Sequence, residues 1–299
     1  MVRVPRDPID AREVVRRLGG TARLSQILPY STQHSIRRAV AEQELRRVSR
    51  GIYSLPETEP AYRAAVASSG LVSHTSAAAH WLLDMLNPDT TAHITVPKHG
   101  RFRPMRGVQV HFSDVAPADD HDGVTSPLRT AIDCAASLPF ADALAIADSA
   151  LRTELITPEA LISAGSRRRG PKSPQVRRVA SQADGGAANP FESCLRAIVL
   201  DAGLSGFEPQ VVLPTSTLSP RVDLANAELQ IAIEADSFTY HGSREALLRD
   251  CRRYSEIAAT GWLLLRFGWE HVMFERDWVA SVVVEACTLQ ASRQKRRWK

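Results

Sequence analysis

Cysteine pairs and metal-binding motifs are scarce in this sequence. Its four cysteines lie far apart, contain no Cys-x-x-Cys pair and are too few to staple 299 residues, which argues against a disulfide framework and a zinc ribbon. Nine histidines are present, but they form no HExxH motif, and none has a cysteine partner at zinc-finger spacing. We therefore expect no structural zinc site.

Long apolar runs are also missing. The longest nearly apolar stretch, residues 279–287, already contains Glu285 and falls far short of the roughly 20 apolar residues that a membrane span needs. The opening residues contain no apolar region that could act as a secretory signal. The sequence therefore predicts a cytoplasmic protein without a membrane partner.

The composition is that of an ordinary globular protein, with 44% hydrophobic and 23% charged residues, and the length suits two or three domains. Charge is distributed unevenly. Residues 1–56 carry 11 basic and 5 acidic side chains, residues 293–299 carry 5 basic and no acidic ones, and the remainder carries 21 basic and 28 acidic. Basic ends on an acidic body indicate contact with a polyanion, and solvated basic ends are the alternative.

The first 56 residues carry the pattern of a small helical module. Apolar residues at helical spacing predict helices over residues 9–18, 21–28 and 31–41, with Thr21 as the cap of the second, and a basic turn within residues 44–55 predicts a β-hairpin. This layout indicates a winged helix-turn-helix that places its third helix in the major groove of double-stranded DNA; a helical protein-interaction module is the alternative. The side chains expected to contact DNA are Gln33, His34, Arg37, Arg38, Arg46, Arg47 and Arg50.

Two motifs in this module resemble the N-terminal domain of AbiEi-type antitoxins of type IV toxin-antitoxin systems. They are the pair Gly19-Gly20 before the second helix and the ending Glu44-Leu45-Arg46-Arg47-Val48-Ser49-Arg50-Gly51-Ile52-Tyr53. The resemblance covers about 45 residues. It implies DNA binding, and it implies a nucleotidyltransferase-type toxin as a partner.

Residues 58–165 mix helices with two apparent strands and contain no catalytic constellation. Helices are expected over 60–67, 73–83, 128–137, 141–151 and 158–164, and strands over 92–96 and 107–112. The runs His74–Ala79 and Thr125–Asp133 resemble the region that follows the winged helix in the same antitoxin family. We expect a scaffold or a partner-binding surface here, followed by a basic linker over residues 166–189 that could include a short helix from 173 to 182.

The C-terminal region places several carboxylates at the ends of predicted elements. Asn189, Pro190 and Glu192 form a strong helix start, so Glu192 has a structural interpretation as a capping-box acid. Strands are expected over residues 207–213, 221–225 and 229–236. If the hairpin centre falls between residues 228 and 229, Asp223 lies directly opposite Glu234. Two facing carboxylates repel each other, and such an arrangement requires either a cation or an exposed surface.

Magnesium or manganese would supply that cation, because these ions prefer carboxylate oxygens and can polarise a phosphodiester. The residues expected to hold the ion are Asp223 and Glu234, with Glu192 as a further candidate. A helix over 244–260 and a strand over 262–267 follow. Taken alone, Asp250 and Arg253 on that helix predict a routine surface ion pair.

The order of these motifs resembles very-short-patch-repair-like, restriction-endonuclease-like domains of an uncharacterised actinobacterial family. The motifs are Glu192, Gln210, Val222–Ala225, Ile233–Asp236, His241, Asp250-x-x-Arg253 and Gly261-Trp262-x-x-Leu265-Arg266-Phe267. The resemblance implies that Asp223 and Glu234 bind a metal ion, that Glu192 is an auxiliary acid and that His241 acts as a base or contacts phosphate. Two positions depart from the pattern: Asp236 stands where the wider superfamily has lysine, and Ser237 stands where glycine is usual. Asp236 either adds a metal ligand or marks a domain that folds without cleaving.

We therefore expect an α/β protein, α+β overall. Its expected parts are a winged helix-turn-helix (1–57), a mixed α/β region (58–165), a basic linker (166–189), a restriction-endonuclease-like domain (190–292) and a basic tail (293–299). The favoured function is DNA binding coupled to a divalent-metal-dependent nuclease-like domain, in phage defence or DNA processing. The alternative is a non-enzymatic antitoxin and transcriptional autorepressor with a catalytically silent nuclease fold.

Overall fold

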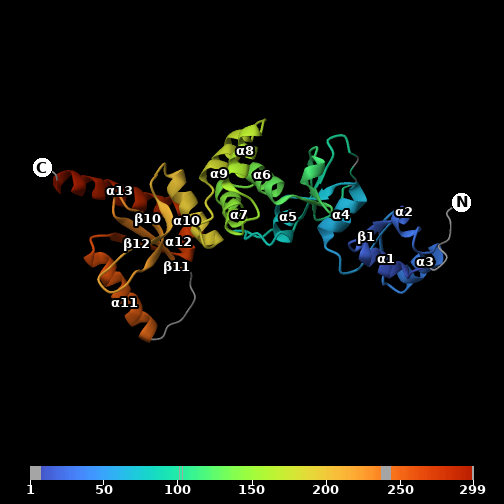
Figure 1. The fold of residues 1–299 in the computed structure, drawn as a ribbon, viewed down its shortest axis with the longest axis horizontal. Coiled ribbons are helices and arrows are strands. Elements are labelled where there is room, and N and C mark those ends of the chain that lie inside the picture. Colours follow the sequence, from blue (N-terminus) through green and yellow to red (C-terminus); the bar gives the residue numbers. More distant parts are fainter. Residues whose placement is uncertain (1–7, 101, 103, 237–243, 298–299) are drawn as a thin grey trace. The chain divides into compact units, whose positions relative to one another are not determined.

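The computed structural model describes residues 8–100, 102, 104–236 and 244–297 (Figure 1). It contains about 49% helix and about 18% strand in mixed sheets, which confirms the α/β character expected from the sequence. The chain forms two compact units: the first holds the described residues up to 82 with 88–133, and the second holds 83–87 with the described residues from 134 onward. No helix in the described ranges is both long and apolar enough to cross a membrane.

The first unit begins with three helices and a three-stranded sheet. The Asp10 carboxylate caps the first helix by accepting from the Arg12 amide (2.9 Å), and the Thr32 hydroxyl caps the third by accepting from the Ser35 amide (3.1 Å). Ile27 lies fully buried in the apolar core between the helices. The strands follow the order β1-β3-β2. The elements are α1 (Ala11–Arg17), β1 (Thr21–Arg23), α2 (Leu24–Ile27), α3 (Gln33–Ala41), β2 (Arg46–Ser49) and β3 (Ile52–Ser54).

Residues 21–23 differ from the expectation that Thr21 caps the second helix. They form β1, which runs antiparallel to β3 with Thr21 opposite Ser54 and the two hydroxyl oxygens 2.8 Å apart. Gly19 and Gly20 have φ angles of 83° and 85°, in the left-handed region that favours glycine, and they turn the chain back toward the hairpin. The second helix therefore starts at residue 24, beyond the strand.

The rest of the first unit is built around a five-stranded sheet of order β6-β5-β4-β8-β7. Parallel pairing of β5 with β6 confirms the two strands expected from the sequence. Val72, Ile94 and Val124 from three neighbouring strands form its buried core. The elements are α4 (Pro60–Ser68), β4 (Leu71–Val72), α5 (His74–His80), β5 (Ala92–Val96), β6 (Val108–Phe112), a 3-10 turn η1 (Pro117–Asp119), β7 (Asp120–His121), β8 (Val124–Thr125) and the start of α6 (Pro127–Ser137).

Four helices open the second unit after the end of α6. They are α7 (Phe140–Arg152), α8 (Pro158–Arg167), α9 (Ser173–Gln182) and α10 (Pro190–Asp201). The short helix expected over residues 173–182 is confirmed as α9, but the linker around it is not, because α9 buries Val176 and Val179 completely. A helix that buries an apolar stripe packs against its neighbours, so residues 166–189 belong to the folded unit.

A buried ion pair joins α7 to α10. Asp148 is fully buried, and both of its carboxylate oxygens lie 2.7 Å from Nη2 of Arg196. The Ser193 hydroxyl (2.8 Å) and the Asp184 amide (2.8 Å) also donate to this carboxylate. Every oxygen of Asp148 therefore has a donor, which is the condition under which a charge can remain in a protein interior.

The second unit ends in a four-stranded sheet of order β12-β11-β10-β9, in which only the β11–β12 pair is parallel. One face packs against α10, α12 and α13 through residues such as Ile231 and Ile233. The other face packs against α11 through Ala232 and Ile257. The elements are β9 (Glu208–Val212), β10 (Arg221–Asn226), β11 (Ile231–Asp236), α11 (Arg244–Ala259), β12 (Leu263–Gly268), α12 (Trp269–Phe274) and α13 (Arg276–Arg297).

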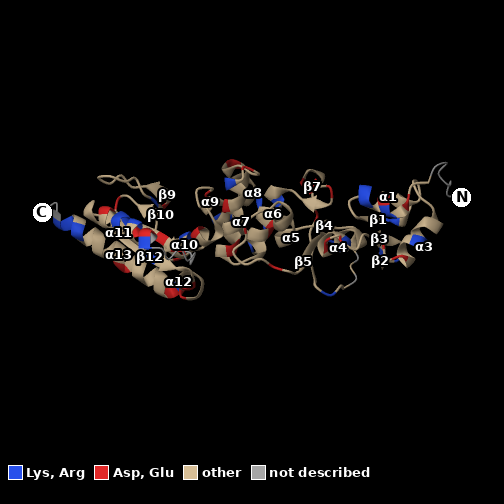
Figure 2. Ribbon diagram, turned by 90° about the horizontal axis from the view of Figure 1, so that it is seen from below, with Lys and Arg blue, Asp and Glu red and all other residues tan. Residues whose placement is uncertain are grey.

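The described part of the expected basic tail, residues 293–297, belongs to this last helix. These residues continue α13, and basic residues are concentrated at its C-terminal end (Figure 2). Cations at this end of a helix interact favourably with the helix dipole. The positive charge of the tail can therefore be explained by the helix itself as well as by contact with a polyanion. The sequence pattern alone did not distinguish these two explanations.

Candidate functional site

The start of α10 holds Glu192 in two roles at once. The Asn189 side chain caps the helix by accepting from the Glu192 amide (3.0 Å), and its Nδ2 donates to Glu192 Oε1 (2.8 Å). The Ala188 amide, one residue before the cap, donates to Oε2 (2.8 Å). Glu192 therefore supports the start of α10, but the expected capping box is not formed, because the Asn189 amide would have to be the donor and Asn189 itself caps the helix amides. The same Oε2 also accepts from Gln210 Nε2 (2.8 Å), which connects the cap to the sheet.

Gln210 links Glu192 to Asp223. Its Nε2 lies 3.2 Å from Asp223 Oδ1, and its backbone has a φ of 54°, an uncommon conformation for a residue other than glycine. In the β9–β10 ladder, Val222 pairs with Val211 and Leu224 pairs with Pro209. Gln210 lies between the two pairs and is itself not paired in the ladder. This local distortion allows one amide to reach two carboxylates.

The β10–β11 hairpin has the register expected from the sequence. Leu224 lies opposite Ile233, and the same register continued by one residue sets Asp223 opposite Glu234. Asp223 Oδ2 also accepts from the Ala235 amide (2.8 Å). The expected register is therefore confirmed, and the Asp223 carboxyl group lies close enough to Glu234 for its charge to raise the pKa of Glu234.

Two arginines, rather than open solvent, balance these acids. Arg253 on α11 forms an ion pair with Glu234, and Arg266 on β12 lies 2.8 Å from Asp236 and 3.9 Å from Glu234. The expected Asp250–Arg253 surface pair is wrong, because Arg253 points into the site and donates to the Arg221 carbonyl (2.6 Å). The sequence placed Arg253 and Arg266 in recognisable motifs but gave no sign of which acids they meet.

Burial makes ionisation of the three inner acids unfavourable. It raises the pKa of Glu234 to about 7; Arg253 opposes this effect, and Asp223 and Asp236 reinforce it. Burial also raises the pKa values of Glu192 and Asp223, with hydrogen bonds from the backbone opposing the rise in both. The Asp223 charge contributes to the raised pKa of Glu192 as well. These acids therefore form one electrostatically linked group.

The donors of this group suit a divalent cation in their chemistry. Carboxylate oxygens are the ligands that Mg²⁺ and Mn²⁺ prefer, and a cation would offset the unfavourable burial of these charges. In the described ranges, however, no group of three or more His, Cys, Asp or Glu side chains is gathered as a metal site. Glu234 and Asp236 have guanidinium partners instead. His241, the expected base or phosphate contact, lies outside the described residues.

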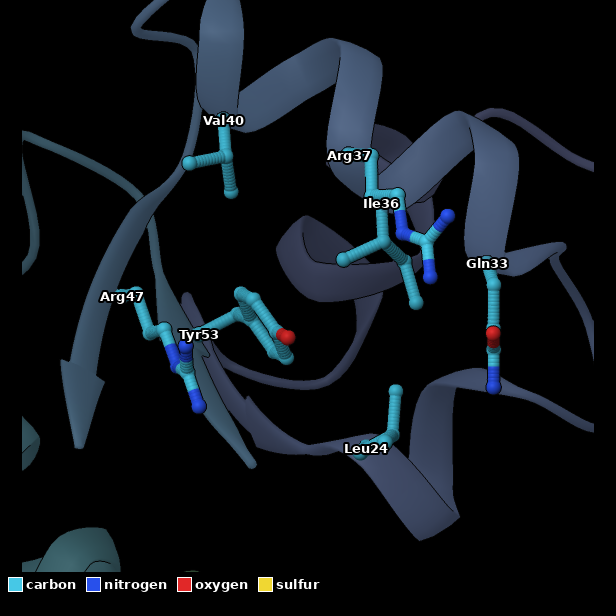
Figure 3. Close-up of a pocket in the computed structure, with 7 residues that line it drawn as sticks. All are labelled: Leu24, Gln33, Ile36, Arg37, Val40, Arg47 and Tyr53. Atoms are coloured by element: carbon cyan, nitrogen blue, oxygen red, sulfur yellow. The ribbon is translucent and has the colours of Figure 1, made fainter. Parts of the chain in front are cut away.

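The seven expected DNA contacts are all exposed on α3 and the β2–β3 hairpin. A hollow of about 390 Å³ lies between these elements. Figure 3 shows Arg37, Arg47 and Gln33 around its apolar lining residues, which include Ile36 and Tyr53. Arg50 lines a neighbouring hollow. His34 and Arg46 are exposed beside them.

Arg38 differs from its neighbour Arg37. Its guanidinium lies 2.6 Å from Asp10 and 3.7 Å from Glu42, so two carboxylates balance its charge. Among the residues that the structure describes, Arg37 has no ion-pair partner. Of the two, Arg37 is the better placed to contact a phosphate.

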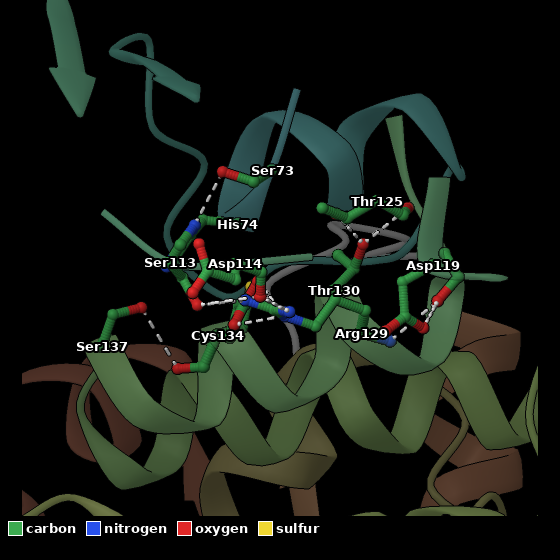
Figure 4. A network of polar contacts seen from close by, with 12 residues as sticks. Ser73, His74, Ser113, Asp114, Asp119, Thr125, Arg129, Thr130, Cys134 and Ser137 are labelled. Atoms are coloured by element: carbon green, nitrogen blue, oxygen red, sulfur yellow. Dashed lines mark hydrogen bonds and ion pairs between the residues drawn. The ribbon is translucent and has the colours of Figure 1, made fainter. Parts of the chain in front are cut away.

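The middle region contains a polar network that the sequence did not reveal. The runs around residues 74 and 125–133 meet close to one another in Figure 4. His74 Nδ1 lies 2.9 Å from the Ser73 hydroxyl, and the His74 ring stacks on His111 with centroids 3.4 Å apart. Arg129 forms a two-oxygen ion pair with Asp133 through Nε (2.9 and 2.8 Å). These contacts explain why polar residues occur in otherwise apolar motifs.

The comparisons with known proteins give few functional clues. No protein-family model matches the sequence. Two proteins of Mycobacterium tuberculosis, from strains CDC 1551 / Oshkosh and ATCC 25618 / H37Rv and both described as uncharacterized, are 30% identical over 171 residues. The match covers 55% of this chain, and the chain spans 62% of the length of these curated relatives.

One solved structure also shows a likeness, the catalytic domain of the homing endonuclease I-Bth0305I. It shares 15% identity, covers 33% of this chain and 95% of that domain, and has a TM-score of 0.29. This score does not establish a shared fold. The function therefore has to be argued from the residues themselves.

The raised pKa of Glu234 predicts a specific dependence of stability on pH. Between about pH 4.5 and pH 7 the folded chain holds this proton and the unfolded chain does not, so the free energy of unfolding decreases as the pH rises. At about 1.4 kcal/mol per pKa unit, Glu234 should contribute a decrease of roughly 3–4 kcal/mol. Urea unfolding at pH 5, 6, 7 and 8 in the presence of EDTA measures it.

The control pair is Glu234→Gln and the exposed Glu245→Gln. We expect the free energy of unfolding to depend less on pH in Glu234→Gln than in wild type. In Glu245→Gln it should depend on pH as it does in wild type. Parallel profiles for wild type and Glu234→Gln would show that this carboxyl does not titrate in that range.

Proposed function

We propose that this chain binds double-stranded DNA and carries a divalent-metal-dependent nuclease centre in its second unit, with a role in phage defence or DNA processing. The single observation that supports the enzymatic part most strongly is the pairing of Asp223 with Glu234 across a hairpin, in a buried group of acids that has arginines at its rim. Carboxylates and guanidiniums are the groups that phosphodiester chemistry uses to hold a cation and a phosphate.

DNA binding is assigned to the N-terminal module. Three helices followed by a basic hairpin, with strand order β1-β3-β2, match the layout of a winged helix-turn-helix. The exposed side chains on α3 and the hairpin carry several hydrogen-bond donors and positive charges that suit phosphates and base edges. Arg37 and Arg47 are the leading contacts, because both line the hollow between the two elements.

In the second unit, each acid has a distinct part. A Mg²⁺ or Mn²⁺ ion held by Asp223 and Glu234, with Asp236 beside them, would polarise the phosphodiester and lower the pKa of the attacking water. Glu192 orients Gln210, and Gln210 in turn holds Asp223 in place. Glu192 is thus an auxiliary acid that positions the centre and also holds the side chain of Asn189, the cap of α10.

A second candidate function is favoured by the arginine pairing of Glu234 and Asp236. If these ion pairs persist on DNA, the acids stay neutralised and the second unit has only a structural or binding role. The chain would then act as a non-enzymatic antitoxin and autorepressor, with a nucleotidyltransferase-type toxin as its partner.

The DNA-binding assignment predicts different effects for two adjacent arginines. Arg37→Ala should weaken binding to a duplex and reduce the slope of log affinity against log salt by about one unit, because one phosphate contact is lost. Arg38→Ala should have a smaller effect on both, since Asp10 and Glu42 already balance its charge. Fluorescence anisotropy across a salt series measures both quantities. An Arg37→Ala variant with wild-type affinity and slope would overturn the assigned contact.

The nuclease assignment predicts that Glu234→Ala abolishes divalent-dependent cleavage while DNA binding by the N-terminal module is retained. A missing phosphate-stabilising lysine would reduce the rate by roughly two to three orders of magnitude, so the assay needs excess protein and long incubation with Mg²⁺ or Mn²⁺. Glu245→Ala, at an exposed position on α11, is the matched control. If wild type cleaves neither duplex nor single-stranded DNA more than Glu234→Ala does, the result would favour the non-enzymatic antitoxin function.

A further inference from the structure

Arg253 and Arg266 are not equivalent partners of the acidic group. Arg266 pairs with Asp236 at 2.8 Å and lies over the Tyr254 ring at 4.0 Å, so a carboxylate and an aromatic face both hold it. The pairing of β11 with β12 also fixes the position of Arg266, because it sets Arg266 opposite Glu234. Arg253 reaches the site from α11 and has Glu234 as its only carboxylate partner among the described residues.

The Arg253–Glu234 pair joins a buried acid to an accessible base. The Glu234 side chain is 5% exposed, whereas that of Arg253 is 30% exposed. A phosphate approaching from solvent can therefore contact Arg253 without first reaching the carboxylate. Arg253 also forms a hydrogen bond with the Arg221 carbonyl, which would keep it at the rim of the site when it leaves Glu234.

Charge balance shows why a cation and a phosphate should assist each other. Asp223, Glu234 and Asp236 face Arg253 and Arg266, so three acids meet two bases. A divalent cation added alone would face two guanidiniums at short range, and this repulsion weakens its binding. A phosphate that draws Arg253 outward removes one of these repulsions and frees a carboxylate oxygen at the same time.

We propose that Arg253 and a divalent cation are alternative partners of Glu234, and that a DNA phosphate selects the cation by drawing Arg253 away. The inference rests on the proposed metal-dependent function and specifies how that site is regulated. The chain holds its acidic centre closed by an internal ion pair until DNA is present. By thermodynamic linkage, DNA must raise the affinity for the cation by the same factor by which the cation raises the affinity for DNA.

Removal of the Arg253 charge should open the site without DNA. In the full chain, Arg253→Gln should bind Mn²⁺ about ten-fold more tightly than wild type, within the range typical of coupled sites. The electron paramagnetic resonance signal of free Mn²⁺ measures this affinity directly and does not depend on cleavage. Adding a short DNA duplex should raise the Mn²⁺ affinity of wild type close to that of Arg253→Gln. The Mn²⁺ affinity of Arg253→Gln itself should change very little.

Two variants serve as controls. Arg252→Gln removes the adjacent arginine, which pairs with Glu256 at 3.1 Å, and should bind Mn²⁺ as wild type does. Arg253→Lys keeps the positive charge and should also stay close to wild type, which separates loss of charge from a loosened fold. An increase in affinity in Arg253→Lys equal to that in Arg253→Gln would contradict the charge argument.

The outcomes separate this inference from the function on which it rests. If Glu234→Ala loses Mn²⁺ binding but wild type and Arg253→Gln bind it equally without DNA, the metal site stands and the inference is overturned. If no variant binds Mn²⁺ with or without the duplex, both are overturned. The inference is supported if Arg253→Gln binds Mn²⁺ more tightly than wild type without DNA and if the additional change Glu234→Ala removes this gain.

Discussion

The arrangement of the second unit depends on the buried ion pair between Asp148 and Arg196. It connects α7 to α10 where water is excluded, and breaking such a pair by removing one partner typically costs about 3–5 kcal/mol. Burial raises the pKa of Asp148, and Arg196 opposes that rise most strongly. Since α10 also carries Glu192, the pair sets the position from which the chain of contacts through Gln210 reaches the sheet.

The acids at the sheet are stabilised in a different way. Asp148 has donors on both oxygens and an arginine that is itself buried, so its contacts form a closed structural unit. Glu234 is nearly as buried, but its partner Arg253 is partly exposed, and two further acids lie nearby. Incomplete compensation of a buried charge is costly to stability, and such groups tend to occur where a ligand completes them.

The parts of the site that lie close in sequence could be predicted. Asn189, Pro190 and Glu192 contain the whole signal for the cap of α10, and the turn at residues 226–228 was enough to set Asp223 opposite Glu234. In both cases the information is confined to a single helix start or a single hairpin. The helix α3 and the basic hairpin followed from local pattern in the same way.

Contacts between distant elements could not be predicted. Arg253 belongs to α11 and Arg266 to β12, and their acids are known only once the order β12-β11-β10-β9 brings these elements together. The same holds for the stacking of His74 on His111, which come from α5 and β6. Packing also explains why the helix over residues 173–182 belongs to a folded unit and not to a linker, because its apolar stripe is short and surrounded by arginines in the sequence.

The central claim is that Asp223 and Glu234 together form a cation site that works beside bound DNA. Crystals of the full chain grown with Mn²⁺ and a short duplex, measured near the manganese absorption edge, test this most directly. The account predicts an anomalous peak at bonding distance from carboxylate oxygens of Asp223 and Glu234, with Arg253 turned toward a phosphate. DNA-bound crystals with no peak there, and with Arg253 still paired to Glu234, would contradict it.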